Sequence, residues 1–87
     1  MFYQEAREVL GSHGIDVGVI NAMTYAEIEG AIARAEDEFE VNCYQTYLSG
    51  MWNDGHFESE EDEGYCRNLI SYCGQRCQEI RYSSSLL

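Results

Sequence analysis

The sequence predicts an all-α fold: a small helical bundle with two long antiparallel helices and a shorter N-terminal helix. The 87 residues include no proline, so no residue forces a break in a helix. Apolar residues recur every three or four positions along most of the chain, as on one face of an α-helix. Helix-starting signals precede the two longest periodic segments. We expect the long helices at about 24–50 and 59–82, within a single helical domain over residues 1–87.

The first long helix is expected to begin at Thr24. Thr24 and Glu27 have the spacing of a capping box, in which each side chain accepts a hydrogen bond from the backbone N–H of the other residue. Gly50 lies where a helix of this length takes its C′ glycine. The segment is therefore predicted to form one continuous helix.

The apolar face changes along this predicted helix. Its first half carries one stripe, formed by Ile28, Ile32, Ala35 and Phe39. Its second half carries another, formed by Val41, Tyr44, Leu48 and Trp52. At about 100° per residue the two stripes point to opposite sides of an unbroken helix. Either the helix bends near residues 40–43, or its second half packs against something that the first half does not reach.

The N-terminal part is expected to contain a helix over residues 2–10, with Gly11 as a natural stop. Residues 12–23 are apolar without a clean period. We favour a short helical turn there, with Asp16 as its N-cap, over a strand, because nothing else in the chain offers a strand to pair with. The side chains expected to reach the core from this turn are Val17, Val19 or Ile20, and Met23.

The last helix is expected to follow a tight turn at Asn53-Asp54-Gly55, residues that tolerate positive φ. Ser59 is its predicted N-cap, and the acidic residues after it suit the positive end of the helix dipole. Its apolar stripe consists of Cys66, Leu69, Ile70, Cys73, Cys77 and Ile80. Three of the four cysteines thus occupy positions where cysteine is a small apolar filler.

Two other uses of the cysteines stay open. Cys73 and Cys77 lie one helical turn apart, so with Cys43 they would supply three metal ligands, although zinc sites usually pair cysteines across a turn. A disulfide framework requires secretion, and the N-terminus lacks the basic and apolar regions of a signal peptide. We expect a reducing, cytoplasmic compartment, cysteines in the core, and no metal or cofactor.

No catalytic motif is present. The chain has two histidines, His13 and His56, and neither has a nucleophile motif near it. The many carboxylates lie at solvated helix starts, where the pKa of a carboxyl group is not raised by burial. We therefore expect that the protein is not an enzyme.

The charge balance excludes several classes of partner. Sixteen acidic residues against five arginines give a net charge of −11, which is opposite to that of a polybasic binder of nucleic acids or anionic membranes. A helix, a glycine-containing turn and a second capped helix also suggest a helix-turn-helix. Its recognition helix would carry Arg34 as its one basic residue among many acids, so direct DNA binding is not expected. No segment approaches the ~20 apolar residues that span a bilayer.

The acidic residues form two clusters. The first comprises Glu36, Asp37, Glu38 and Glu40, and the second comprises Glu58, Glu60, Glu61, Asp62 and Glu63. Antiparallel packing is expected to bring residue 63 beside about residue 44, which would place both clusters on one half of the molecule. We predict that they bind a basic surface of another protein; the alternative is a solvated acidic face.

The second apolar stripe offers a different function. Aromatic and methionine side chains are enriched at protein contacts, and the candidate anchors here are Tyr44, Tyr47, Leu48, Met51 and Trp52. A chain of this length buries only about 60–65% of its unfolded surface, so a partner subunit would add stability. The alternative hypothesis is a homo-oligomer, most simply a homodimer, that uses the Val41 to Trp52 stripe as its subunit contact.

The overall profile resembles a class of proteins. In its small size, strong acidity, helical pattern and lack of catalytic motifs, the chain is similar to the small inhibitors encoded by bacteriophages and mobile elements, anti-CRISPR proteins among them. That resemblance implies a non-enzymatic, nucleic-acid-mimicking inhibitor in the host cytoplasm, which covers the cationic nucleic-acid-binding surface of a host complex. It implies no direct contact with nucleic acid or membrane.

Overall fold

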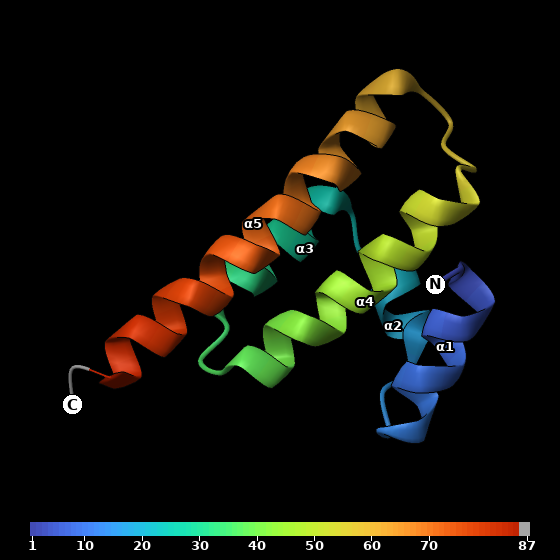
Figure 1. Cartoon of the computed structure of the whole chain (residues 1–87). Helices are drawn as coiled ribbons and strands as arrows, with labels where there is room; N and C mark the ends of the chain where they lie inside the picture. Colours follow the sequence, from blue (N-terminus) through green and yellow to red (C-terminus); the bar gives the residue numbers. More distant parts are fainter. Residues whose placement is uncertain (86–87) are drawn as a thin grey trace.

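Five helices make up the part of the chain that the computed structural model describes, residues 1–85 (Figure 1). They are α1 (Tyr3–Ser12), α2 (Val17–Asn21), α3 (Tyr25–Arg34), α4 (Glu38–Asp54) and α5 (Glu60–Ser85). The predicted all-α bundle is confirmed, and residues 1–85 contain no strand. None of these helices is both long and apolar enough to cross a lipid bilayer.

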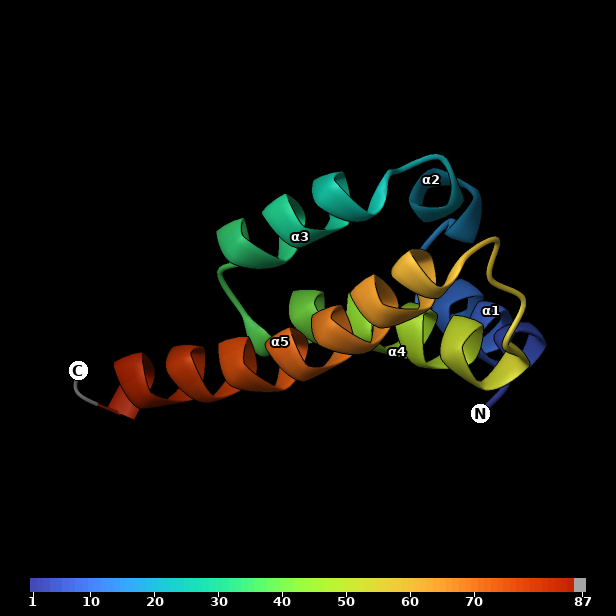
Figure 2. The ribbon, with the colours of Figure 1, turned by 90° about the horizontal axis from the view of Figure 1, so that it is seen from above.

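An antiparallel pair, α4 and α5, forms the centre of the fold. The helix α1 packs against α4, and α3 lies along α5 (Figures 1 and 2). Because Tyr25 stacks on Tyr65 near the start of both helices, while the end of α3 contacts Arg76, α3 runs parallel to α5. The core lies between these elements, and Ile28, Ile32, Val41, Leu48 and Leu69 are almost fully buried in it.

The prediction of one helix over residues 24–50 is wrong, because the chain turns between α3 and α4. Thr24 does begin a helix with its capping box. That helix ends at Arg34; Ala35 is extended (φ −62°, ψ 137°) and so is Asp37 (φ −137°, ψ 162°). The Asp37 carboxylate then accepts a hydrogen bond from the Glu40 N–H at 2.8 Å and starts α4. The break lets Ile28 and Ile32 of the first stripe reach the same core as Val41 and Leu48 of the second.

Arg76 of α5 holds the end of α3 in place. Its Nε donates to the Ile32 carbonyl at 3.2 Å and its Nη2 to the Ala35 carbonyl at 2.8 Å. The last carbonyls of a helix have no partner within the helix and carry partial negative charge. A guanidinium group therefore satisfies both of these carbonyls and ties α3 to α5.

The glycine predicted to end the helix has a different role. Gly50 lies inside α4 and is buried, and a Cβ atom there would come within 2.9 Å of the Ala6 Cβ and 3.0 Å of the Tyr3 Cα. Gly50 thus allows α1 to approach α4 closely. The residue that ends α4 is Gly55, in the left-handed conformation at φ 69°, which glycine adopts without steric cost.

The predicted N-caps at Asp16 and Ser59 are confirmed, whereas Gly11 does not end the first helix, because α1 continues to Ser12. Asp16 caps α2 by accepting from the Gly18 N–H at 2.9 Å, and Ser59 accepts from the Asp62 N–H at 3.2 Å at the start of α5. Of the candidate core residues in α2, Val17 and Ile20 are buried, whereas Val19 is 62% exposed.

Replacing Gly50 by alanine should destabilise the protein by about 1–3 kcal/mol, because the added methyl group meets backbone and cannot be accommodated without a shift. Gly74→Ala is the matched control: it lies inside α5 with nothing within 4 Å of its added Cβ. Since alanine is the better helix former, this control should gain about 0.5–1 kcal/mol. Urea unfolding curves measure both, and effects of the same sign would contradict the close contact.

Arg76→Gln should lower the free energy of unfolding by about 1.5–3 kcal/mol, since it removes hydrogen bonds from a charged donor that is only 17% exposed. The control is Arg81→Gln, which removes the ion pair of a 70% exposed arginine with Glu38. Exposed ion pairs contribute little, so this loss should be clearly smaller. Equal losses in chemical denaturation would show that Arg76 does not fix the α3 terminus.

Candidate functional site

The two acidic clusters lie at opposite ends of the central helix pair, so their predicted placement on one half of the molecule is wrong. Arg81, near the end of α5, donates to Glu38 at the start of α4 at 2.6 Å, and Cys66 donates to the Leu48 carbonyl at 3.4 Å. About 28 Å of helix, at 1.5 Å per residue, separates Asp62 from Arg81. Residue 63 therefore lies beside the end of α4, far from the first cluster.

The first cluster is partly used by the fold itself. Asp37 caps α4, and Glu38 is paired with Arg81. Glu36 and Glu40 are exposed in the same turn. Two of the four predicted contact residues therefore have structural roles, which makes this cluster the weaker candidate for a purely electrostatic surface.

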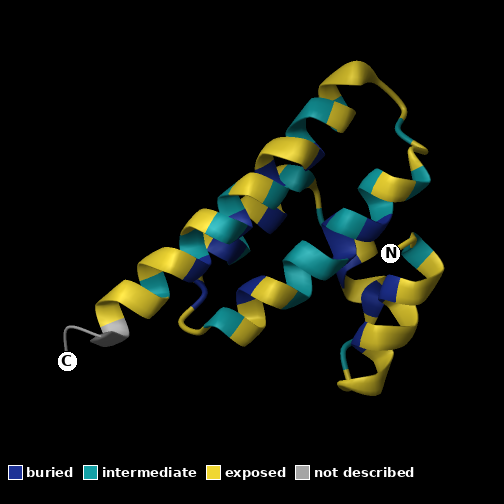
Figure 3. Ribbon diagram, viewed as in Figure 1, coloured by how far each residue is buried: buried dark blue, intermediate teal, exposed yellow. Residues whose placement is uncertain are grey.

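The second cluster surrounds the start of α5 and is largely exposed (Figure 3). The acidic residues of its first turn are Glu60, Glu61, Asp62 and Glu63, with Glu58 just before them. Both ion pairs found within residues 1–85 involve other carboxylates, those of Glu38 and Glu79. None of these five carboxylates therefore forms an ion pair with an arginine within residues 1–85.

Two tyrosines and a further carboxylate extend this surface across to α3. The Tyr25 and Tyr65 rings stack with centroids 5.6 Å apart, and the Tyr65 hydroxyl donates to Glu29 at 2.7 Å. That hydrogen bond raises the pKa of the Tyr65 hydroxyl. Burial, followed by the nearby charges of Cys66, Asp62 and Glu58, raises the pKa of Tyr25. No sequence signal placed these residues together, because the parallel arrangement of α3 and α5 depends on the undetected break.

A groove of about 660 Å³ opens beside the second cluster, between the start of α3, the end of α4 and the loop after it. Its walls are mostly apolar and aromatic, and two carboxylates lie at its edge. The lining includes Tyr25, Tyr47, Met51, Phe57, Glu58 and Asp62. The surface at this end of the molecule thus combines negative charge with aromatic rings.

The predicted anchor residues are used mainly within the chain. Tyr47 and Leu48 are buried, and Tyr44, Met51 and Trp52 are half-buried against the core. Trp52 packs on Phe57, with ring centroids 6.1 Å apart. The stripe proposed as a subunit contact is therefore largely covered by the chain's own helices.

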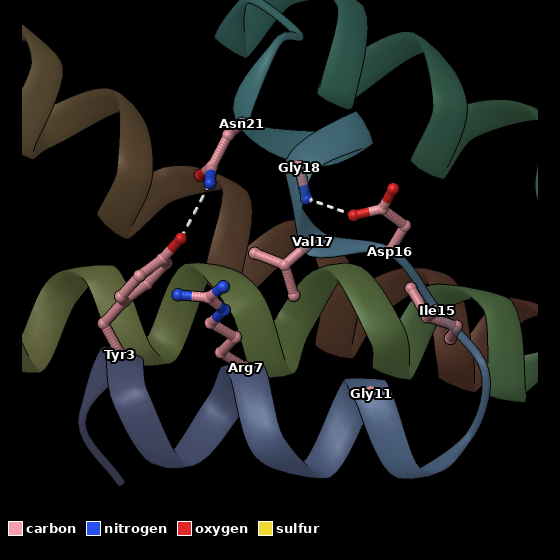
Figure 4. Close-up of a pocket in the computed structure, with 8 residues that line it drawn as sticks. All are labelled: Tyr3, Arg7, Gly11, Ile15, Asp16, Val17, Gly18 and Asn21. Carbon is pink, nitrogen blue, oxygen red and sulfur yellow. Dashed lines mark hydrogen bonds between the residues drawn. The ribbon is translucent and has the colours of Figure 1, made fainter.

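Tyr47 also anchors α1 and α2 through a short polar network. Its hydroxyl donates to the Asn21 Oδ1 at 2.6 Å, and the Asn21 Nδ2 donates to the Tyr3 hydroxyl at 2.7 Å. Figure 4 shows the hydrogen bond between Asn21 and Tyr3 at a hollow of about 320 Å³ between α1 and α2. The Arg7 side chain points into this hollow. Burial raises the pKa of Tyr47 to about 12, so its hydroxyl remains a donor at neutral pH.

The cysteines are free, and three of them, Cys66, Cys73 and Cys77, are buried. Burial raises the pKa of Cys66 to about 11 and that of Cys73 to about 12, the latter with a contribution from Cys77. Raised pKa values leave little reactive thiolate at neutral pH. Among residues 1–85, no three metal-binding side chains lie close enough together to hold an ion.

The two histidines are not paired with nucleophilic side chains within residues 1–85. His13 packs edge-on against Phe39, with ring centroids 5.6 Å apart, and His56 is exposed beside the groove at the end of α4. Neither forms a hydrogen bond with a nucleophilic side chain within the described chain. His13 thus packs against an aromatic ring, and His56 is a surface residue.

Comparison with known proteins gives no relative: the chain matches no family model, no curated protein and no solved structure. Function is therefore inferred from the surface alone. The two features that bear on it are the carboxylates at the start of α5, which form no ion pair within residues 1–85, and the half-buried Tyr25 and Tyr65 beside them.

Because the Cys66 and Cys73 thiols are buried, we expect the free energy of unfolding to fall at alkaline pH. In the unfolded chain a thiol has a pKa near 8.5, whereas in the folded chain the Cys66 and Cys73 pKa values are about 11 and about 12. Between about pH 9 and pH 11 the unfolded state thus binds fewer protons, and the free energy of unfolding declines by up to about 1.4 kcal/mol per pH unit for each thiol. Below about pH 8 this contribution is fully present.

Urea unfolding at pH 7 to 11 measures that slope. A Cys66→Ala/Cys73→Ala variant is the control, because it has lost both thiols and should show a shallower decline. An identical slope in the two proteins would mean that the buried thiols do not titrate with raised pKa values.

Proposed function

We propose that this chain is a non-enzymatic interaction protein that covers a cationic, nucleic-acid-binding surface of another protein. One observation carries the proposal: five carboxylates lie together around the exposed start of α5, with no ion pair to an arginine within residues 1–85. Folding must absorb their mutual repulsion, which salt screens only beyond about 8 Å. A partner with clustered arginine or lysine residues would remove that repulsion on binding.

The aromatic residues beside the carboxylates suit the same partner. The Tyr25 and Tyr65 rings lie next to the acidic turn, and guanidinium groups bind aromatic faces as well as carboxylates. Arginine-rich surfaces that bind nucleic-acid phosphates present these groups in number. Carboxylates at the start of α5 would occupy the positions of phosphates, as expected of an inhibitor of the phage-encoded, anti-CRISPR-like class in a host cytoplasm.

The structure changes which residues the proposal uses. Since the first cluster lies at the far end of the helix pair, the proposed contact is formed by the second cluster with Glu29, Tyr25 and Tyr65. A homo-oligomer built on the Val41 to Trp52 stripe has little surface left, because Val41, Tyr47 and Leu48 are buried within the chain.

Neutralising part of the cluster should weaken binding to a cationic probe. We expect a fluorescein-labelled nona-arginine peptide to bind the protein, with an affinity that falls steeply as salt is raised. The triple variant Glu60→Gln/Glu61→Gln/Glu63→Gln should bind it at least about tenfold more weakly. Fluorescence anisotropy at several salt concentrations measures both effects, and circular dichroism confirms that α5 is intact.

The matched control changes the net charge by the same amount elsewhere. Glu5, Glu8 and Glu79 are exposed on α1 and near the end of α5, and their triple replacement by glutamine should alter the affinity by less than about twofold. If both triple variants lose affinity equally, the peptide responds only to total charge. The proposal of a specific surface at the start of α5 would then be wrong.

A further inference from the structure

A second surface, separate from the one proposed above, surrounds Phe39 in the first turn of α4. Phe39 belongs to the first predicted apolar stripe, but the break after α3 turns it outward, and it is 54% exposed. Val19, in the neighbouring α2, is 62% exposed. His13 contacts the Phe39 ring edge-on. An exposed aromatic ring beside other apolar side chains is a typical anchor in a protein contact.

Hollows lie on both sides of this ring. A groove of about 350 Å³ between α2 and α4 is lined by apolar residues, among them Ile15, Val19, Ile20 and Cys43. A smaller one of about 250 Å³ lies toward the end of α1, beside Val9 and His13. Phe39 and Cys43 line both. Together they form one apolar surface across the ends of three helices.

The rim of the larger groove is acidic. Asp16, Asp37 and Glu40 line it. Burial, followed by the charges of Asp37 and Glu40, raises the pKa of the Cys43 thiol, which also lines the groove, so both carboxylates act at the groove itself. Asp16 and Asp37 each use their Oδ1 atom to cap a helix, which leaves their negative charge in place. Arg34 lies near Tyr44, where its charge opposes the rise in the Tyr44 pKa that burial and Glu40 cause.

This groove has two candidate occupants, a second copy of this chain and a basic segment of another protein, and the charges favour the basic segment. In a symmetric dimer the same surface is present on both subunits, so the acidic rims of two copies would face each other in a chain that already carries a net charge of −11. Like charges brought together in this way oppose association. A segment with apolar side chains flanked by lysine or arginine would fill the groove and neutralise its rim.

We propose that the groove between α2 and α4, with Phe39 at its edge, binds a basic amphipathic helix of another protein. Its apolar side chains pack against Phe39, Val19 and Cys43, and its basic side chains pair with Asp16, Asp37 and Glu40. The mode is that of a helix laid into a hydrophobic groove. Because the groove lies at the opposite end of the α4 and α5 pair from the acidic turn of α5, this site does not depend on the function proposed above.

The test uses a synthetic peptide of about 18 residues, roughly five helical turns, with leucines on one face and lysines elsewhere. A second peptide carries glutamate in place of each lysine. We expect the lysine peptide to bind, and Phe39→Ala to weaken its binding by about tenfold or more. Val19→Ser should also weaken it, and Glu40→Gln should do so by about threefold. Anisotropy gives the affinities, and NMR shifts of the α2 and α4 amides locate the peptide.

Phe2→Ala is the matched control, because Phe2 is similarly exposed (57%) but does not line the groove. It should leave the affinity unchanged within about twofold. The variant Glu60→Gln/Glu61→Gln/Glu63→Gln should retain the dependence on Phe39, which separates this site from the acidic turn of α5.

Three results would overturn the proposal. One is an equal loss of affinity in the Phe39 and Phe2 variants, and another is equally tight binding of the glutamate peptide. The third is a dimer in analytical ultracentrifugation that Phe39→Ala dissociates, because the groove would then be occupied by a second copy of this chain.

Discussion

The arrangement of the helices depends on how the chain is held at the break between α3 and α4. At this break the Arg76 guanidinium binds the Ile32 and Ala35 carbonyls, and the Asp37 carboxylate begins the next helix. Without Arg76, the Ala35 carbonyl would lose the hydrogen bond that it accepts from the guanidinium, and the Ile32 carbonyl would keep only its bond from the Ala35 N–H, which is costly at a buried helix end. One arginine therefore allows the chain to end a helix inside the bundle and to place α3 along α5.

This break decides which surfaces the molecule exposes. It directs Ile28 and Ile32 into the same core as Val41 and Leu48, whereas a straight helix would have pointed them to opposite sides. It also turns Phe39 out of the core, beside His13 and the acidic rim of the α2 and α4 groove. Finally, it brings Tyr25 and Glu29 next to the acidic turn of α5. The negative charge is thus divided between two distant surfaces with different apolar surroundings.

Local signals in the sequence were sufficient for the fold class and for the caps at Asp16, Thr24 and Ser59, because each depends on residues within one turn. The break was missed although Asp37 and Glu40 have the spacing of a helix start and follow the change of apolar face. What selects it is the contact with Arg76, some forty positions away, and sequence spacing does not reveal such a contact. The role of Gly50 also depends on a distant contact, the packing of α1, and the separation of the acidic clusters depends on the break, so local spacing predicts neither.

Solution NMR of the intact chain tests this account most directly, through backbone Cα chemical shifts and interproton contacts over residues 24–54. The account predicts helical shifts over residues 25–34 and 38–54, non-helical shifts at 35–37, and a contact between the Arg76 side chain and Ala35. Uninterrupted helical shifts from Thr24 to Asp54 would contradict it. Phe39 would then lie on one continuous helix with Ile32 and Val41, and neither proposed surface would exist in the form described.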